Sequence, residues 1–187
     1  TVTGIIEDPS IDTDSAVELA ARVSRDLEEM ADRLGLERVR SSSDQHLFVA
    51  GIGRPSTEAD SAAEFALVVA PLLDRFSQDT GVDAGFRIGM SSGDVISGLL
   101  ASEQLTYGVF GQPPQTAVAL GAIAGPGQIL MHESIVGELD SKWQLEPTNN
   151  LLDLRGEDIQ ASRLIGSRQN GPDVVEGTPE PKLSGSG

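Results

Sequence analysis

Two stretches of the chain, residues 16–34 and 57–78, repeat apolar residues three and four positions apart, the spacing of an amphipathic helix. A third helix is expected over residues 113–124. Gly35 follows the first stretch and is a typical helix stop, while Pro113 and Pro114 open the third, where the first turn has no donor to lose. Pro71 lies inside the second stretch, which predicts either a kinked helix or a helix that begins late.

Shorter apolar runs, bounded by glycine, proline and polar residues, predict strands. They lie at residues 1–7, 38–43, 47–50, 86–90, 105–110, 128–131, 143–145, 151–154 and 159–165. Residues 44–46 are expected at or near a hairpin turn, and short helices are expected at 95–99, inside a glycine-punctuated connection, and at 133–139. Helices interspersed with hairpin-compatible strands indicate an α+β sandwich, a largely antiparallel sheet with helices packed on it, and not a doubly wound sheet.

Acidic residues dominate the charge, since 29 Asp and Glu against 13 Lys and Arg give a formal net charge of −16. This balance disfavours nucleic-acid binding by phosphate neutralisation and direct contact with an anionic membrane. The chain has no cysteine, which excludes disulfides, thiolate catalysis and Cys-ligated metal sites. With 39% hydrophobic but only 4% aromatic residues, an ordered domain with an aliphatic core is expected.

The composition divides the chain into two parts. Residues 1–166 are expected to form one domain, and residues 167–187 a disordered tail or linker, because nearly half of that segment is Gly, Pro or Ser. No apolar run reaches the roughly 20 residues that a membrane helix needs. Because the first residue is Thr1, the chain is expected to be a fragment, cytoplasmic in location, of a parent protein that could itself be membrane-anchored.

Several segments occur in the order and spacing of a known family. Residues 87–98 (RIGMSSGDVISG), 107–117 (YGVFGQPPQTA) and 124–131 (AGPGQILM) resemble consecutive motifs of the class III nucleotidyl cyclase homology domain, the catalytic module of adenylate and guanylate cyclases. Residues 44–55 resemble the hairpin of the same family. The resemblance covers residues 2–166.

The resemblance implies a cyclase-like fold with a ferredoxin-like core, and head-to-tail dimers with active sites between the protomers. In the family, two Asp hold two Mg²⁺ or Mn²⁺ ions on the triphosphate, a Lys and an Asp read the purine, an Asn orients the ribose, and an Arg stabilises the pentavalent phosphorus. Oxygen ligands suit Mg²⁺, and a cation offsets the charge on the transferring group. The products are a cyclic nucleotide and pyrophosphate.

Asp8 and Asp44 match the two metal positions of the family. Each also has a simpler explanation, because Asp8 precedes Pro9 as an ordinary turn former and Asp44 could cap a hairpin. The family's glycine-containing phosphate loop is replaced by residues 8–14 (DPSIDTD), which put extra carboxylates where phosphate oxygens would lie. That replacement is electrostatically adverse to a triphosphate.

The other functional positions depart from the family. Arg40 stands where the purine-reading Lys would be, and Gly108 where the Asp would be. Gln115 replaces the Asn, and Ala119, one helical turn later, replaces the Arg. Loss of such an arginine typically removes on the order of 10³–10⁵ in rate. A homodimer would therefore contain no complete site.

These observations predict a catalytically degenerate cyclase homology domain, a regulatory or dimerisation module that pairs with itself or with another cyclase-like domain. No cofactor is expected for a degenerate domain, whereas an active chain would use Mg²⁺ or Mn²⁺. One alternative is an adenylate or guanylate cyclase in which this chain is the metal-binding half of a heterodimer; another is a non-turnover ligand pocket. Of the two histidines, His46 is expected in a partly buried strand and His132 in a solvated loop.

Overall fold

The computed structural model describes residues 1–3, 13–41, 45–52, 58–82, 84–101, 105–148, 151–152, 156 and 158–168. Its main sheet has the strand order β2-β3-β1-β4-β7-β11-β8. In chain order these strands are β1 (Val2–Thr3), β2 (Glu37–Ser41), β3 (Gln45–Val49), β4 (Arg87–Met90), β7 (Ile129–His132), β8 (Trp143–Pro147) and β11 (Ala161–Ser167). All neighbours pair antiparallel except β4 and β7, so the largely antiparallel α+β fold is confirmed.

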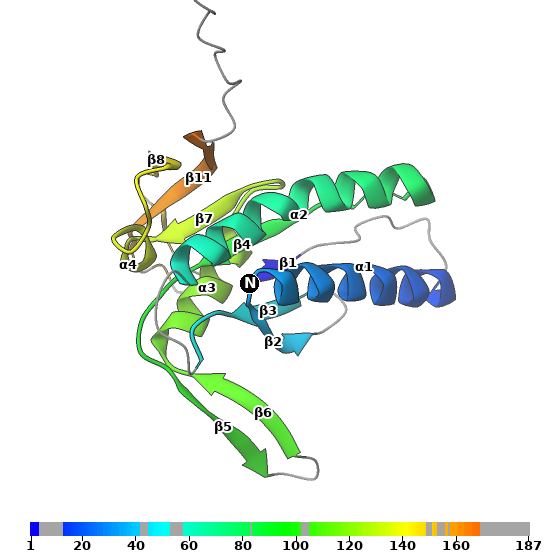
Figure 1. Ribbon diagram of the computed structural model, residues 1–187, viewed down its shortest axis with the longest axis horizontal. Coiled ribbons are helices and arrows are strands. Elements are labelled where there is room, and N and C mark those ends of the chain that lie inside the picture. Colours follow the sequence, from blue (N-terminus) through cyan, green and yellow to red (C-terminus); the bar gives the residue numbers. More distant parts are fainter. Residues whose placement is uncertain are drawn as a thin grey trace, which may run out of the picture.

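Helices cover both faces of this sheet. The helices are α1 (Thr13–Arg33), α2 (Glu58–Thr80), α3 (Gln112–Ile123) and the short α4 (Glu133–Val136). In β4, Ile88 and Met90 join the large core under α1 and α2, whereas Gly89 between them faces α3. In β7, Leu130 packs in a second cluster with Leu120 of α3. The alternation of strand side chains thus places the sheet between the α1–α2 layer and α3 (Figure 1).

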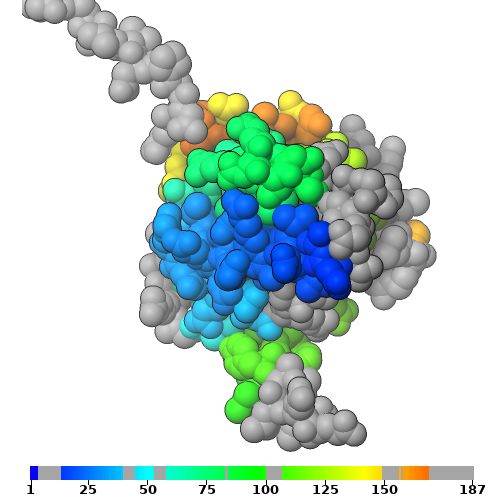
Figure 2. Space-filling view, turned by 90° about the vertical axis from the view of Figure 1, so that its right-hand side faces the viewer, coloured from blue at the N-terminus to red at the C-terminus, as the bar shows by residue number. Residues whose placement is uncertain are grey.

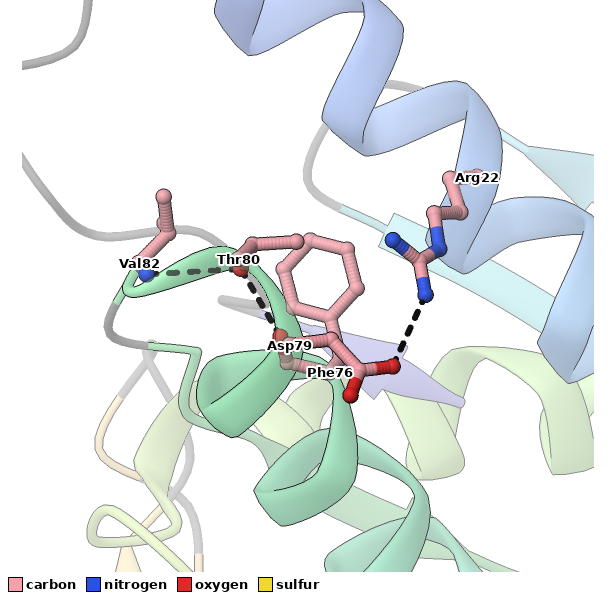
Figure 3. Close-up of polar contacts among 5 residues, drawn as sticks. All are labelled: Arg22, Phe76, Asp79, Thr80 and Val82. Carbon is pink, nitrogen blue, oxygen red and sulfur yellow. Dashed lines mark hydrogen bonds and ion pairs between the residues drawn. The ribbon is translucent and has the colours of Figure 1, made fainter.

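The α1–α2 layer is tied together near the end of α2 (Figure 3). Arg22 of α1 pairs with Asp79 at 3.1 Å, and its guanidinium carbon lies 5.6 Å from the ring centroid of Phe76. Thr80 Oγ1 donates to the Phe76 carbonyl and accepts from the Val82 backbone N–H, which satisfies groups that the helix end leaves unpaired. Because the Arg22–Asp79 pair is largely exposed, its contribution to stability is small.

The predicted helix at residues 95–99 is wrong, because this segment is strand β5 (Ile96–Ala101). It pairs antiparallel with β6 (Leu105–Phe110) along its whole length, forming a separate two-stranded sheet. The local pattern of residues 95–99 fits either element, and pairing with β6 decides between them. The hairpin projects from the body in Figures 1 and 2.

The remaining expectations fall close to the structure. The three predicted helices are confirmed as α1, α2 and α3, and α2 begins well before Pro71, so the late start is wrong. The last predicted strands correspond to β8, β9 (Leu151–Leu152), β10 (Asp158–Ile159) and β11. Among the described residues, no helix is long and apolar enough to cross a membrane.

Candidate functional site

Three elements that carry the predicted purine, ribose and phosphorus positions meet at one end of the fold. Arg40 lies on β2, Gly108 on β6, and Gln115 and Ala119 on α3. β6 contacts both β2 and α3, so the fold brings the three elements together although they are far apart in the sequence. The two predicted metal ligands, Asp8 and Asp44, lie outside the described residues.

Gly108 lies beneath the ring of Phe110. A Cβ added at Gly108 would lie 2.6 Å from Phe110 Cζ, which shows that the ring occupies the space above this glycine. On the opposite strand the directly facing residue is Gly98, so neither strand offers a side chain here except the partly exposed Phe110. An Asp at position 108 would require the ring to swing away. The surface at this position is therefore apolar and has no carboxylate with which to read a purine edge.

Helix α3 presents a neutral surface. Its sequence from Gln112 to Ile123 contains no charged residue. Gln115 is exposed and Ala119 partly exposed, and because they lie four residues apart they share one face of the helix. In the place where a cation would be expected to offset phosphate charge, this face offers an amide and a methyl group.

A cavity of about 530 Å³ opens beside these elements, between the end of β3, the first turns of α2 and the loop that follows β4. Much of its lining is apolar, and its charged lining residues are Glu58, Asp94 and Glu138. Within the described part of the chain, no Lys, Arg or His lines it, and Glu58 Oε1 has no hydrogen-bond partner. The three carboxylates on the described part of the lining repel a triphosphate.

A polar cluster fastens α2 to the segment before β8. Asp60 of α2 accepts hydrogen bonds from the Trp143 indole N–H at 2.6 Å and the Asp140 backbone N–H at 3.1 Å, and its other oxygen lies 3.3 Å from Lys142 Nζ. Burial alone would raise the pKa of Asp60, but the hydrogen bonds from Asp140, Trp143 and Lys142 outweigh it and lower this pKa to about 2. The hydrogen bond between the Asp60 and Asp140 carboxyl groups, followed by repulsion from the Asp60 charge, raises the pKa of Asp140.

We expect Asp60→Asn to lower the free energy of unfolding by about 1–2 kcal/mol at neutral pH, because the charge-assisted hydrogen bonds are weakened. The Asp60 carboxyl has a lower pKa in the folded state than its value of about 3.9 in the unfolded chain. Ionised Asp60 therefore stabilises the fold fully above about pH 4, and this stability is lost as the pH falls through about 2. The difference between wild type and variant, measured by urea unfolding, should therefore shrink below pH 4. A difference that is constant across this range would contradict the assignment.

The two histidines differ in their surroundings. His46, on β3, is 2% exposed, which agrees with a buried strand position. His132 ends β7 and caps α4 through its side chain, so it is not in the solvated loop that the sequence suggested. Sequence reasoning also missed the hairpin β5–β6, although the alternation of apolar and small or polar residues from Leu105 to Phe110 is a signal for its second strand.

The sequence model of the adenylate and guanylate cyclase catalytic domain matches residues 9–164. Adenylate cyclases of Mycobacterium bovis and Mycobacterium tuberculosis are 26% identical over 161 residues, which is 84% of this chain. The chain spans 36% of the length of these relatives.

Solved structures of cyclase domains share the fold. The guanylate cyclase domain of RhGC from Catenaria anguillulae, in complex with GTP, has a TM-score of 0.80 and 21% identity, covering 89% of this chain and 94% of its own. The adenylyl cyclase CyaB from P. aeruginosa has a TM-score of 0.76 at 14% identity, covering 86% and 87%. The non-canonical dimeric guanylyl cyclase domain of the RhoGC fusion protein from Blastocladiella emersonii has a TM-score of 0.74 at 23% identity, covering 84% and 86%.

Proposed function

Because this chain belongs to the adenylate and guanylate cyclase catalytic domain family, we propose that it is a catalytically degenerate member, a regulatory and dimerisation module within a longer signalling protein. The observation that carries the proposal is the surface formed by β6 and α3. There, Gly108 under the Phe110 ring, Gln115 and Ala119 occupy the positions that the motif resemblance assigns to the family's purine, ribose and phosphorus contacts. Neither a carboxylate for the purine nor a cation for the phosphorus is present at these positions.

The acidic cavity supports the same proposal from charge. A nucleoside triphosphate needs metal ions or basic residues to offset its own charge, yet the charged side chains that line the cavity among the described residues are carboxylates. Mg²⁺ or Mn²⁺ held by Asp8 and Asp44 would supply part of this offset; both residues lie outside the described part of the chain.

The β5–β6 hairpin supports dimerisation. Of the six large hydrophobic residues that are exposed in the described part of the chain, four lie on it: Ile96, Leu99, Tyr107 and Phe110. The described residues of the hairpin carry no charge, and a two-stranded sheet is marginal in water without a packing partner. A second copy or another cyclase-like domain would cover this surface.

The direct test is a cyclase assay. We expect purified protein with ATP or GTP and Mn²⁺ to release no cyclic nucleotide, because loss of the arginine position alone removes on the order of 10³–10⁵ in rate. Turnover that Asp44→Ala abolishes would contradict the proposal and support an active enzyme. The matched control for the preparation is Gly137→Ala, an exposed position where an added Cβ meets nothing within 4 Å.

The competing function is the metal-binding half of a heterodimeric cyclase, with Asp8 and Asp44 as ligands and the missing groups supplied by a partner. The similarity to proteins named adenylate cyclases favours it. Mixing with full cyclase domains separates the two functions, since a gain of activity that Asp44→Ala removes is expected only for the half-site. In either case we propose that residues 1–166 form the domain and that residues 167–187 form a tail or linker on the cytoplasmic side.

A further inference from the structure

The cavity between β3, α2 and the loop after β4 is separate from three of the positions that the motif resemblance assigns to the nucleotide. Gly108, Gln115 and Ala119 are not among its lining residues. Part of its wall is formed instead by residues of the large core, among them Ile88 and Met90 of β4. The cavity is therefore a second candidate site.

The wall of this cavity is largely apolar. The rings of Phe48 on β3 and Phe65 on α2 pack together with centroids 4.8 Å apart, and Met90 and Val109 add further apolar surface. The volume of about 530 Å³ lies within the range of small-molecule sites. Such a wall favours a ligand with an apolar body, because binding removes apolar surface of both partners from water.

Glu58, in the first turn of α2, brings a carboxylate to this wall. Its Oε1 is shielded from water and has no hydrogen-bond partner. The other oxygen, Oε2, lies over the backbone of Gly51, 2.9 Å from the place where a Cβ would be. The start of a helix is favourable for a carboxylate, but that position alone leaves Oε1 unsatisfied. An unsatisfied buried acceptor that carries charge costs free energy, and a cation beside it would offset this cost.

The other charged residues of the described lining have the same sign as Glu58. Asp94 belongs to the loop after β4, and Glu138 follows α4. Glu138 Oε1 accepts a hydrogen bond from Ser92 Oγ at 2.7 Å, which holds this carboxylate in place. Because the described part of the lining contains no Lys, Arg or His, its side chains attract positive charge.

We propose that the cavity binds an amphipathic organic cation, an ammonium group on an apolar body, with Glu58 as its counter-ion. An anion would be repelled by the carboxylates, and a neutral apolar molecule would leave Glu58 unsatisfied. A hydrated Mg²⁺ or Ca²⁺ ion takes oxygen ligands and would leave the wall around Phe48 and Phe65 facing water. The organic cation satisfies both the charge and the apolar wall.

The test is an NMR titration of the whole chain with probes that share one apolar body: phenethylammonium, phenethyl alcohol and phenylacetate. About 0.15 M salt screens the general attraction of a chain with a net charge of −16 for cations. We expect phenethylammonium to shift the amide signals of Gly51 and Gly93, which line the cavity, in a saturable way.

The alcohol should bind at least about tenfold more weakly than the ammonium, the factor for a hydrogen bond to a charged group, and phenylacetate should not bind. Methylammonium, which has the charge without the apolar body, should also bind at least about tenfold more weakly.

The matched variants lie on the same helix. Glu58→Gln keeps the size of the side chain and removes its charge, and Glu64→Gln makes the same change at an exposed residue of α2 that does not line the cavity. We expect Glu58→Gln to lose the preference for the ammonium over the alcohol, and Glu64→Gln to keep it.

A wild type that binds the alcohol as tightly as the ammonium overturns the proposal, and so does the absence of a saturable shift at the cavity. An equal preference in the two variants would show that Glu58 is not the counter-ion. If Glu58→Gln does not fold, the comparison of the probes on the wild type still decides. Release of cyclic nucleotide by the wild type would contradict the proposed degenerate function and not this inference, because the cavity does not include Gly108, Gln115 or Ala119.

Discussion

Gly89→Ala should destabilise the domain by about 3 kcal/mol, at the upper end of the range for overpacking. Gly89 is the residue of β4 that faces α3, and a Cβ there would overlap the Ala117 carbonyl oxygen and the Gly121 backbone nitrogen. Both are backbone atoms, so no side chain can turn aside. The helix would have to lift from the sheet, which would open the cluster that joins Leu120 to Leu130.

Thermal unfolding measures this effect, with an expected fall in Tm of about 10 °C for a domain of this size. The control is Gly137→Ala, whose backbone is right-handed helical with φ −69° and whose added Cβ meets nothing within 4 Å. We expect it to be neutral or to stabilise by up to about 1 kcal/mol, through the unfolded chain. A Gly89→Ala variant as stable as this control would show that α3 does not pack on β4 at backbone distance.

Much of this fold can be predicted from the sequence, because the local pattern of most main elements agrees with the structure they form. The apolar spacing in α1 and α2 and the proline pair at the start of α3 each point to one structure. The hairpin is different. Residues 95–99 mix aliphatic residues with glycine and serine, so their local pattern does not choose between helix and strand. Pairing with β6, which no local pattern reports, decides it.

The candidate site could be predicted only as a set of positions. The family motifs indicate which residues stand where a cyclase would read its purine, but not that the Phe110 ring covers Gly108. Likewise, spacing does not reveal that Ser92, Ser134 and His132 form one hydrogen-bonded chain, because they belong to different elements brought together by the parallel pairing of β4 and β7. Tertiary contacts of this kind leave no periodic signal in the sequence.

The double variant Leu99→Ser with Tyr107→Ser should weaken dimerisation at least about 30-fold, because two central apolar anchors of an interface typically contribute more than 2 kcal/mol together. These two residues face each other across β5 and β6 and are 67% and 37% exposed. Since they are exposed in the monomer, the unfolding midpoint should change little. The control is Val17→Ser on α1, where an apolar residue is 64% exposed, about as much as Leu99. We do not expect this variant to weaken dimerisation.

Sedimentation equilibrium of wild type and both variants measures the dissociation constants, with cyclase-like partners added where the chain alone stays monomeric. The formal charge of −16 on each copy opposes self-association, so the homodimer should tighten as salt is raised toward 0.15 M, where the Debye length is about 8 Å. A hairpin interface built from Leu99 and Tyr107, apolar and uncharged, should not weaken with salt. A double variant that dimerises as tightly as Val17→Ser would show that the partner binds elsewhere, and the dimerisation function would then lose the surface on which it rests.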